Sequence, residues 1–256
     1  MKYFCFTVDD NIRFLKELTE GSYGSLFDHP YLAMYKRLHE LFGLKIQLNL
    51  FYSMDGFDLS MMSEKYANQW REVSDWLKLS FHSKLENVRP YEGSGYAEVF
   101  KDASDVHREI IRFAGASSLA ETTTVHFCKT TVEGNSALRD LGVRGLLGLY
   151  GTQREKRISY SLPDDAADAV RLGKTVEVGG ITHGAIDVIV NLYDTATAVE
   201  KLQTLIGREQ IRLMMHEQYF YPDYPRYQSE FEYKLYMSFS LLKEKGYESK
   251  FFEEMI

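Results

Sequence analysis

Short apolar runs alternate along the chain with stretches in which apolar residues recur at helical spacing. The runs are typical of buried strands, and the spaced residues are typical of amphipathic helices. Strands are predicted over residues 3–8, 45–52, 77–81, 122–127, 143–150, 185–192 and 211–215. Helices are predicted over residues 34–42, 63–76, 104–114, 135–141, 199–206 and 231–242. Glycines follow several of these helices, as is common at helix C-termini.

The repeated strand-then-helix units predict a parallel sheet covered by helices. An irregular (β/α)7 barrel fits them better than an open doubly wound sheet, which stays the alternative. The length of 256 residues also fits one barrel of about 250 residues. No Pro-, Gly- or Ser-rich linker divides the chain, so a single domain over residues 1–256 is expected.

Composition narrows the possible partners and the compartment. The chain has 30 Lys+Arg against 37 Asp+Glu and a net charge of −7, which argues against a nucleic-acid partner. Two cysteines, Cys5 and Cys128, cannot form a disulfide framework, so a reducing compartment is expected. The sequence shows neither a signal-peptide core nor a run of about 18 apolar residues. We therefore expect a cytoplasmic protein without membrane insertion.

Polar residues that could carry chemistry stand at the ends of several predicted strands. They are Asp9, Asp10, His82, His126 and His216. Active sites of βα folds lie at the carboxyl ends of the strands, so these side chains are expected to share one rim. Each also has an ordinary explanation, because an Asp after a strand often caps a helix and a lone His often only completes hydrogen bonds.

The two adjacent aspartates are expected to have different roles. Successive side chains of an extended strand point in opposite directions, so Asp9 and Asp10 are expected to do different jobs. One can bind a metal while the other faces a water or the substrate. A metal held by one Asp and two His, with an open position for water, is a common hydrolytic site.

Three short motifs resemble those of the polysaccharide deacetylase family, the NodB-like carbohydrate esterases. Thr-Val-Asp-Asp at residues 7–10 resembles that family's Thr-Phe-Asp-Asp motif. His-Ser at residues 82–83 is similar to the start of its second motif, and Leu-Met-Met-His at residues 213–216 to its last. Their order and wide spacing agree with the family, so the resemblance spans roughly residues 3–217.

The resemblance implies a fold, a reaction and residue roles. The fold would be an irregular (β/α)7 barrel, and the reaction would be removal of an N-acetyl group from an aminosugar of a polysaccharide or its biosynthetic intermediate. Asp9 would be the general base, Asp10 and His82 metal ligands, and His216 the general acid. Zinc is the expected cofactor, and cobalt or nickel fit the same ligands.

The third metal ligand departs from the family pattern. The family has a second His about four residues after the first, where this chain has Glu86. His107 is the first candidate instead, because it lies near the start of the predicted helix 104–114, whose positive end favours a neutral imidazole. Glu86 and His126 are the other candidates.

Further family features lack clear counterparts. Residues 124–127 do not show the family's third motif, and only Asp187 stands as a possible residue to orient the acidic His. An aromatic cluster after His216 could stack on a sugar ring; it consists of Tyr219, Phe220, Tyr221, Tyr224 and Tyr227. A non-catalytic carbohydrate-binding protein on the same barrel is therefore the alternative function.

Overall fold

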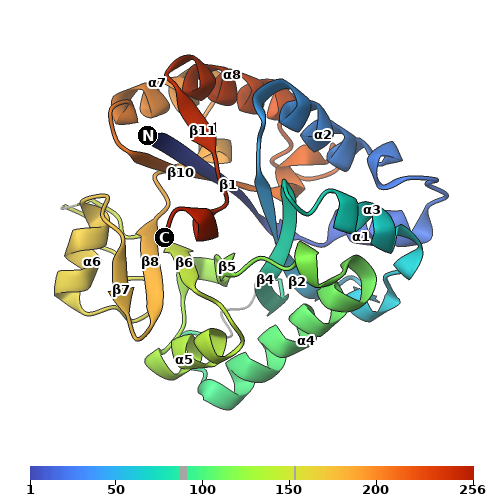
Figure 1. Ribbon diagram of the computed structural model, residues 1–256, viewed down its shortest axis with the longest axis horizontal. Helices are drawn as coiled ribbons and strands as arrows, with labels where there is room; N and C mark the ends of the chain where they lie inside the picture. Colours follow the sequence, from blue (N-terminus) through green and yellow to red (C-terminus); the bar gives the residue numbers. More distant parts are fainter. Residues whose placement is uncertain (87–90, 153) are drawn as a thin grey trace.

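The computed structural model describes residues 1–86, 91–152 and 154–256, with strands at the centre and helices around them (Figure 1). The strands are β1 (Lys2–Asn11), β2 (Ile46–Met54), β3 (Phe57–Asp58), β4 (Leu77–Leu85), β5 (Thr122–Thr123), β6 (Gly145–Gly148), β7 (Val176–Val178), β8 (Ile181–Ala185), β9 (Val188–Ile189), β10 (Gln210–His216) and β11 (Tyr247–Ser249). The α-helices are α1 (Arg13–Glu20), α2 (Pro30–Phe42), α3 (Ala67–Glu72), α4 (Tyr96–Ala114), α5 (Val132–Asp140), α6 (Asp164–Arg171), α7 (Thr195–Leu205) and α8 (Phe231–Glu244).

The strands of the described residues form two sheets. The seven-stranded sheet runs β3-β2-β1-β10-β9, with β4 also paired to β2 and β11 to β1. The four-stranded sheet runs β5-β6-β8-β7. The pairs β2–β3 and β7–β8 are antiparallel, whereas β1 is parallel to each of its neighbours. The architecture is thus a mixed α/β fold built largely on parallel strands.

A closed (β/α)7 barrel is not confirmed, because the hydrogen-bonded ladder is interrupted between the two sheets. Strand β5 pairs with β6 but not with β4 among the described residues; one isolated bridge, from Leu79 to Leu119, links the two regions. The reason is local, since β5 ends at Thr123 rather than continuing to Phe127 as predicted. The predicted strand 185–192 is likewise divided, into the end of β8, the short β9 and a 3-10 turn, Val190–Leu192.

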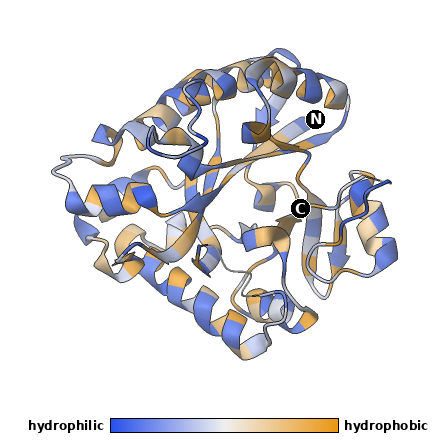
Figure 2. Cartoon of the chain, turned by 180° about the vertical axis from the view of Figure 1, so that it is seen from behind, coloured by the Kyte–Doolittle hydropathy of each residue, from blue (hydrophilic) through white to orange (hydrophobic). Residues whose placement is uncertain are grey.

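One hydrophobic core nevertheless joins the two sheets, so the chain packs as one domain. Phe6, Leu48 and Leu79 of the larger sheet belong to the same buried cluster as Leu146 and Leu147 of the smaller one. Burial of such side chains is the main favourable term in folding. Hydrophobic residues are frequent on the strands, as Figure 2 shows.

The last residues of the chain pack beneath the smaller sheet. A Cβ atom on Gly145 would lie 2.9 Å from Ile256, and one on Gly184 would lie 2.9 Å from the Phe252 ring. A side chain at either position would displace neighbouring atoms, because the C-terminal segment packs closely against both glycines. Glu253 accepts a hydrogen bond from the Glu121 amide at 2.6 Å and also pairs with Lys78. The segment therefore contacts elements of both sheets.

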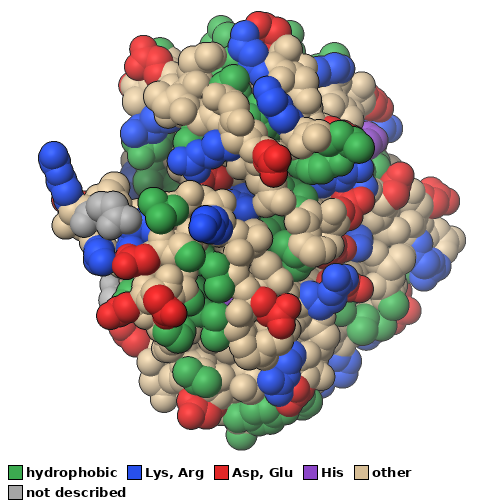
Figure 3. Space-filling model, turned by 60° about the vertical axis from the view of Figure 1, so that its left-hand side comes forward, with side chains coloured by type: hydrophobic (Ala, Val, Ile, Leu, Met, Phe, Trp, Pro, Cys, Tyr) green, Lys and Arg blue, Asp and Glu red, His purple; other side chains and the backbone are tan. Residues whose placement is uncertain are grey.

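The outer surface carries both signs of charge. On the face shown in Figure 3, Lys and Arg side chains are interspersed with Asp and Glu side chains. Across the described residues, no helix combines the length and the apolar character needed to cross a bilayer.

Candidate active site

Strand β1 ends in a bulge that turns both aspartates toward one pocket. The register between β1 and β2 shifts between Val8 and Asn11, and Asp10 has a left-handed backbone with φ of 61°. Asp is among the residues that tolerate this conformation, and bulges are frequent beside active sites. The chain is therefore not extended at Asp10. Contrary to the expectation of opposite directions, Asp9 and Asp10 line the same pocket of about 280 Å³.

A second bulge presents His82 from β4. Leu50 of β2 pairs with Phe81 and Phe51 pairs with Ser83, so His82 is the additional residue between them. The side chain is only 2% exposed, and its Nδ1 donates a hydrogen bond to the Thr124 carbonyl. This contact fixes the tautomer, as it does for many metal-ligating histidines. It leaves the Nε2 lone pair facing the Asp10 carboxylate at 3.1 Å.

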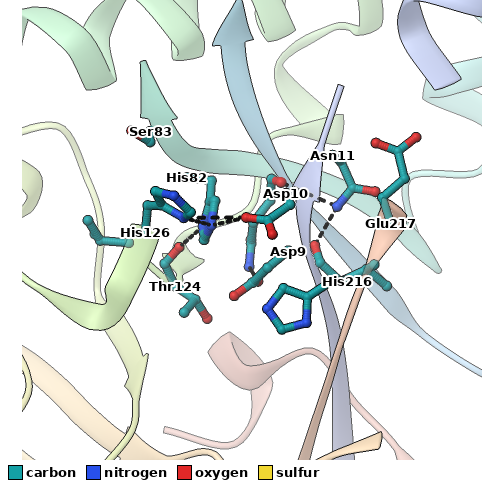
Figure 4. Close-up of polar contacts among 12 residues, drawn as sticks. Asp9, Asp10, Asn11, His82, Ser83, Thr124, His126, His216 and Glu217 are labelled. Atoms are coloured by element: carbon teal, nitrogen blue, oxygen red, sulfur yellow. Dashed lines mark hydrogen bonds and ion pairs between the residues drawn. The ribbon is translucent and has the colours of Figure 1, made fainter. Parts of the chain in front are cut away.

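The third member of the cluster is His126. It opens a 3-10 turn, His126–Cys128, in which Phe127 and Cys128 have left-handed φ angles of 58° and 56°. The turn places Nδ1 of His126 3.0 Å from Nε2 of His82 and 3.3 Å from Oδ1 of Asp10. Figure 4 shows the two rings and the Asp10 carboxylate converging. Ligand atoms of these three residues all lie within 4.8 Å of one another.

The cluster fits a small divalent cation. Donor atoms around a tetrahedral ion with bonds of about 2.1 Å lie about 3.4 Å apart, close to the 3.0, 3.1 and 3.3 Å found here. A neutral His82 would also point a lone pair at the acceptor oxygen of Asp10. Such a contact is favourable only when a positive charge lies between the two atoms. Two imidazoles and one carboxylate are ligands that zinc accepts.

The pKa shifts of the cluster residues also favour a bound cation. Burial alone would raise the pKa of Asp10, but hydrogen bonds from His126 and His82 outweigh it and hold that pKa well below its usual range. Burial alone would lower the pKa of His82, but the charges of Asp9 and Asp10 raise it above its usual value. Burial dominates at His126 and lowers its pKa. The two aspartates thus favour a cation at this point, and a metal would compete there with a proton.

Asp9 lies beside the cluster and is held in place by a separate set of hydrogen bonds. Its Oδ1 accepts a hydrogen bond from Nδ2 of Asn49 at 2.6 Å, and Oδ1 of Asn49 accepts one from Nε2 of Gln47 at 2.7 Å. Asp9 is 2% exposed. Burial raises its pKa, against the lowering effect of His82 and His216. A carboxylate with a raised pKa is better suited to take up a proton than one with its usual pKa.

His216 is paired with Asp9 across the parallel strands β1 and β10. Its Nδ1 lies 3.0 Å from Oδ1 of Asn191, a buried residue of the turn Val190–Leu192. Asp187 does not contact His216. Its carboxylate instead accepts hydrogen bonds from the Arg212 amide and from Arg208, each at 2.8 Å. Asn191 therefore orients the imidazole, a role that the sequence did not reveal because Asn191 lies inside the predicted strand 185–192.

His107 is not part of the cluster. Its helix, α4, begins at Tyr96 and not near residue 104, so His107 lies in the middle of the helix and far from its positive end. It is 7% exposed, and burial lowers its pKa to about 4. Glu86 lines the pocket without joining the three-residue group, and its pKa is raised by burial and by the charges of Asp10 and Asp55.

The rest of the pocket wall combines apolar side chains with Arg157 and Gln218. Its apolar and aromatic members are Phe127, Leu149, Ile189, Met214 and Tyr224. A second hollow of about 440 Å³ adjoins it and shares Asp10, Glu86, Gln218 and Tyr224 with it. Of the aromatic cluster after His216, only Tyr224 lines both hollows among the described residues. Tyr219 and Tyr221 are buried instead.

Comparison with known proteins finds resemblance only in structure. No family model matches the sequence, and no curated protein matches it. A family 4 acetyl xylan esterase from Clostridium thermocellum, solved in complex with a cobalt ion, is similar with a TM-score of 0.56 at 12% identity, over 99% of this chain and 90% of that one. A peptidoglycan N-acetylglucosamine deacetylase has a TM-score of 0.57 at 10% identity, over 99% and 87%.

Two further structures show that this likeness concerns the fold alone. A family 4 pseudoenzyme from Bacillus anthracis has a TM-score of 0.54 at 10% identity, over 99% of this chain and 64% of that one. A 4-alpha-glucanotransferase from Thermococcus litoralis has a TM-score of 0.60 at 11% identity, over 99% and 40%. The chain thus shares its fold, at low sequence identity, with structures of carbohydrate esterase family 4, whose motifs it resembles, and with the glucanotransferase.

Proposed function

We propose that this protein is a metal-dependent hydrolase that removes an N-acetyl group from an aminosugar of a polysaccharide or its biosynthetic intermediate. Asp10, His82 and His126 would hold the metal, with His126 in place of the expected His107. The observation that carries the proposal is the convergence of their ligand atoms at separations of 3.0–3.3 Å. A divalent cation at this point, with zinc as our choice, would supply Lewis-acid activation of a water and of the substrate carbonyl.

The neighbouring residues divide the proton transfers. Asp9, kept in place by Asn49, accepts the proton from the attacking water. His216, oriented by Asn191, donates a proton to the departing sugar amine. The two residues are paired across β1 and β10, so they lie side by side in the pocket that contains the cluster. This arrangement yields acetate and a free amine.

The substrate class has independent support. Two of the proteins with this fold are named for acetylated carbohydrates, one a xylan esterase and one an N-acetylglucosamine deacetylase. The apolar wall beside the cluster also suits an acetyl methyl group, and Tyr224 suits a sugar face.

Metal analysis and acetate release test the proposal together. We expect the purified protein to take up one equivalent of zinc and to release acetate from N-acetylated oligosaccharides. The double variant Asp10→Ala, His82→Ala should lose both properties while keeping its fold by circular dichroism. Zinc uptake without acetate release from a panel of N-acetyl and O-acetyl sugars would contradict the enzymatic part.

A non-catalytic carbohydrate-binding protein is the second candidate. It is favoured by the pseudoenzyme that shares the fold and by Glu86 at the position of the family's second histidine. It predicts that sugars bind without hydrolysis and that zinc does not change their affinity. Calorimetric titration of N-acetylated oligosaccharides into zinc-loaded and zinc-free protein separates the two functions.

A further inference from the structure

The chain that follows β10 folds back over the end of β1 and is anchored there by Glu217. This residue opens a 3-10 turn, Glu217–Phe220, and is 1% exposed. Its Oε2 accepts hydrogen bonds from the amides of Ile12 and Arg13 at 2.7 and 3.0 Å. Its Oε1 accepts one from the Phe14 amide at 2.7 Å. The carboxylate points away from the metal-ligand cluster (Figure 4).

These contacts replace a missing helix cap. The residue before α1 is Ile12, which makes no side-chain cap, so the first amides of α1 need an acceptor from elsewhere. Glu217 supplies it from a segment distant in sequence, and the hydroxyl of Tyr221 donates to the same carboxylate at 2.9 Å. The turn after β10 is therefore fixed relative to the end of β1, where Asp10 lies.

The anchor brings Gln218 against Asp10. Nε2 of Gln218 donates a hydrogen bond to Oδ2 of Asp10 at 2.8 Å. The other carboxylate oxygen, Oδ1, faces His82 and His126 at 3.1 and 3.3 Å. The two oxygens of Asp10 thus have separate partners, one an amide donor and the other the ligand cluster.

We propose that Gln218 is a positioning residue that holds the Asp10 carboxylate in its ligand orientation. This inference rests on the proposed metal site. Asp10 lies on a bulge and has a left-handed backbone, so the sheet alone does not fix its side chain. A neutral amide fixes one oxygen without cancelling the negative charge that attracts the metal, which a Lys or Arg in its place would do. Hydrogen-bonding partners of metal ligands typically contribute 10–100-fold to metal affinity.

The test compares zinc affinities by competition with a chromophoric chelator at fixed pH. Gln218→Met keeps the length of the side chain and removes the donor, and Gln218→Ala is a second variant in case the first folds poorly. The matched control is Gln210→Met, because Gln210 lies at the other end of β10 and donates to the Met255 carbonyl. We expect zinc binding to weaken roughly 10–100-fold in the Gln218 variants and to be unchanged in the control.

The outcomes separate this inference from the proposed function. The melting temperature of the zinc-free Gln218→Met variant should equal that of the wild type, since the Glu217 anchor is kept. Equal zinc affinity of wild type and Gln218→Met would overturn the role of Gln218 while leaving the metal site intact. A wild-type protein that takes up no zinc would overturn both.

Discussion

Nε2 of His82 and Nδ1 of His126 lie 3.0 Å apart, although the first is on β4 of the larger sheet and the second follows β5 of the smaller one. In the family that the motifs resemble, the second histidine follows the first within about four residues. In the metal site that we propose, the turn after β5 would supply it instead. The ligand chemistry would then be kept, with the second histidine provided by a residue further along the chain.

Replacement of His126 should abolish zinc binding, and replacement of His107 should not. His126→Ala removes one of three proposed ligands, so we expect zinc affinity to fall by more than about 100-fold, beyond the loss of a supporting contact. His107→Ala serves as control, because that residue is buried in α4 outside the cluster. Loss of zinc binding in His107→Ala with retention in His126→Ala would reverse the assignment.

His107 should make the protein sensitive to mild acid. Its pKa in the folded protein is about 4, below the ordinary value of 6.5, because burial disfavours the charged ring. The unfolded chain therefore takes up the proton first, and stability that is present above pH 6.5 is lost as the pH falls toward 4. The loss amounts to roughly 3 kcal/mol at about 1.4 kcal/mol per pKa unit.

His107→Leu isolates this contribution. Urea unfolding of both proteins at pH 7 and pH 4.5, with chelator present, gives the difference in their free energies of unfolding. We expect that difference to shift by about 2–3 kcal/mol in favour of the variant at the lower pH. An equal pH dependence in the two proteins would show that His107 titrates normally.

Asn191 should matter for turnover and not for metal binding. Asn191→Leu removes the hydrogen-bond partner of His216, so the proposed general acid loses its orientation. We expect kcat to fall about 10–100-fold, a part of the roughly 100- to 10,000-fold that general acid catalysis contributes, with KM and zinc affinity unchanged. Asn191→Asp keeps an acceptor oxygen and should restore most of the activity. Steady-state kinetics of the wild type and the two Asn191 variants give kcat and KM. A changed KM with constant kcat would indicate that Asn191 contacts the substrate instead.

Tyr224 should contribute to substrate binding. It is half-buried and lines both hollows, so its ring is available to a sugar that spans them. Tyr224→Ala is expected to raise KM roughly three- to tenfold with little change in kcat, as the loss of one aromatic contact implies. Tyr227→Ala is a suitable control, because that tyrosine lines neither hollow. Equal effects of the two substitutions would contradict a specific role.

Some of the strands were predictable from sequence, because strongly apolar runs identify buried parallel strands. The run that predicts residues 45–52 becomes Ile46–Met54, and the one at 211–215 becomes Gln210–His216. Asp9 and His216 accordingly meet across adjacent strands. Helix starts were harder to predict: α4 begins at Tyr96, directly after Gly95, and not near residue 104. The misplaced start led to the choice of His107.

The position of His126 was not predictable from local pattern. Residues 122–127 look like a continuous strand, but the chain turns after Thr123 through two left-handed residues, neither of them glycine. Such turns carry no sequence signal and are imposed by tertiary contacts. The bulges at Asp10 and His82 could not be predicted from the sequence either, because a register shift depends on the partner strand as well as on the residues themselves.

The division of the proposed ligands between two separate ladders has a mechanical consequence. Asp10 and His82 come from one ladder and His126 from the turn after the other. An ion held by all three would therefore cross-link a seam where, among the described residues, the two ladders are joined by one isolated backbone bridge. Saturation with the ion would then raise the free energy of unfolding of the protein. Protease resistance along that seam would report the loading of the site before any substrate is known.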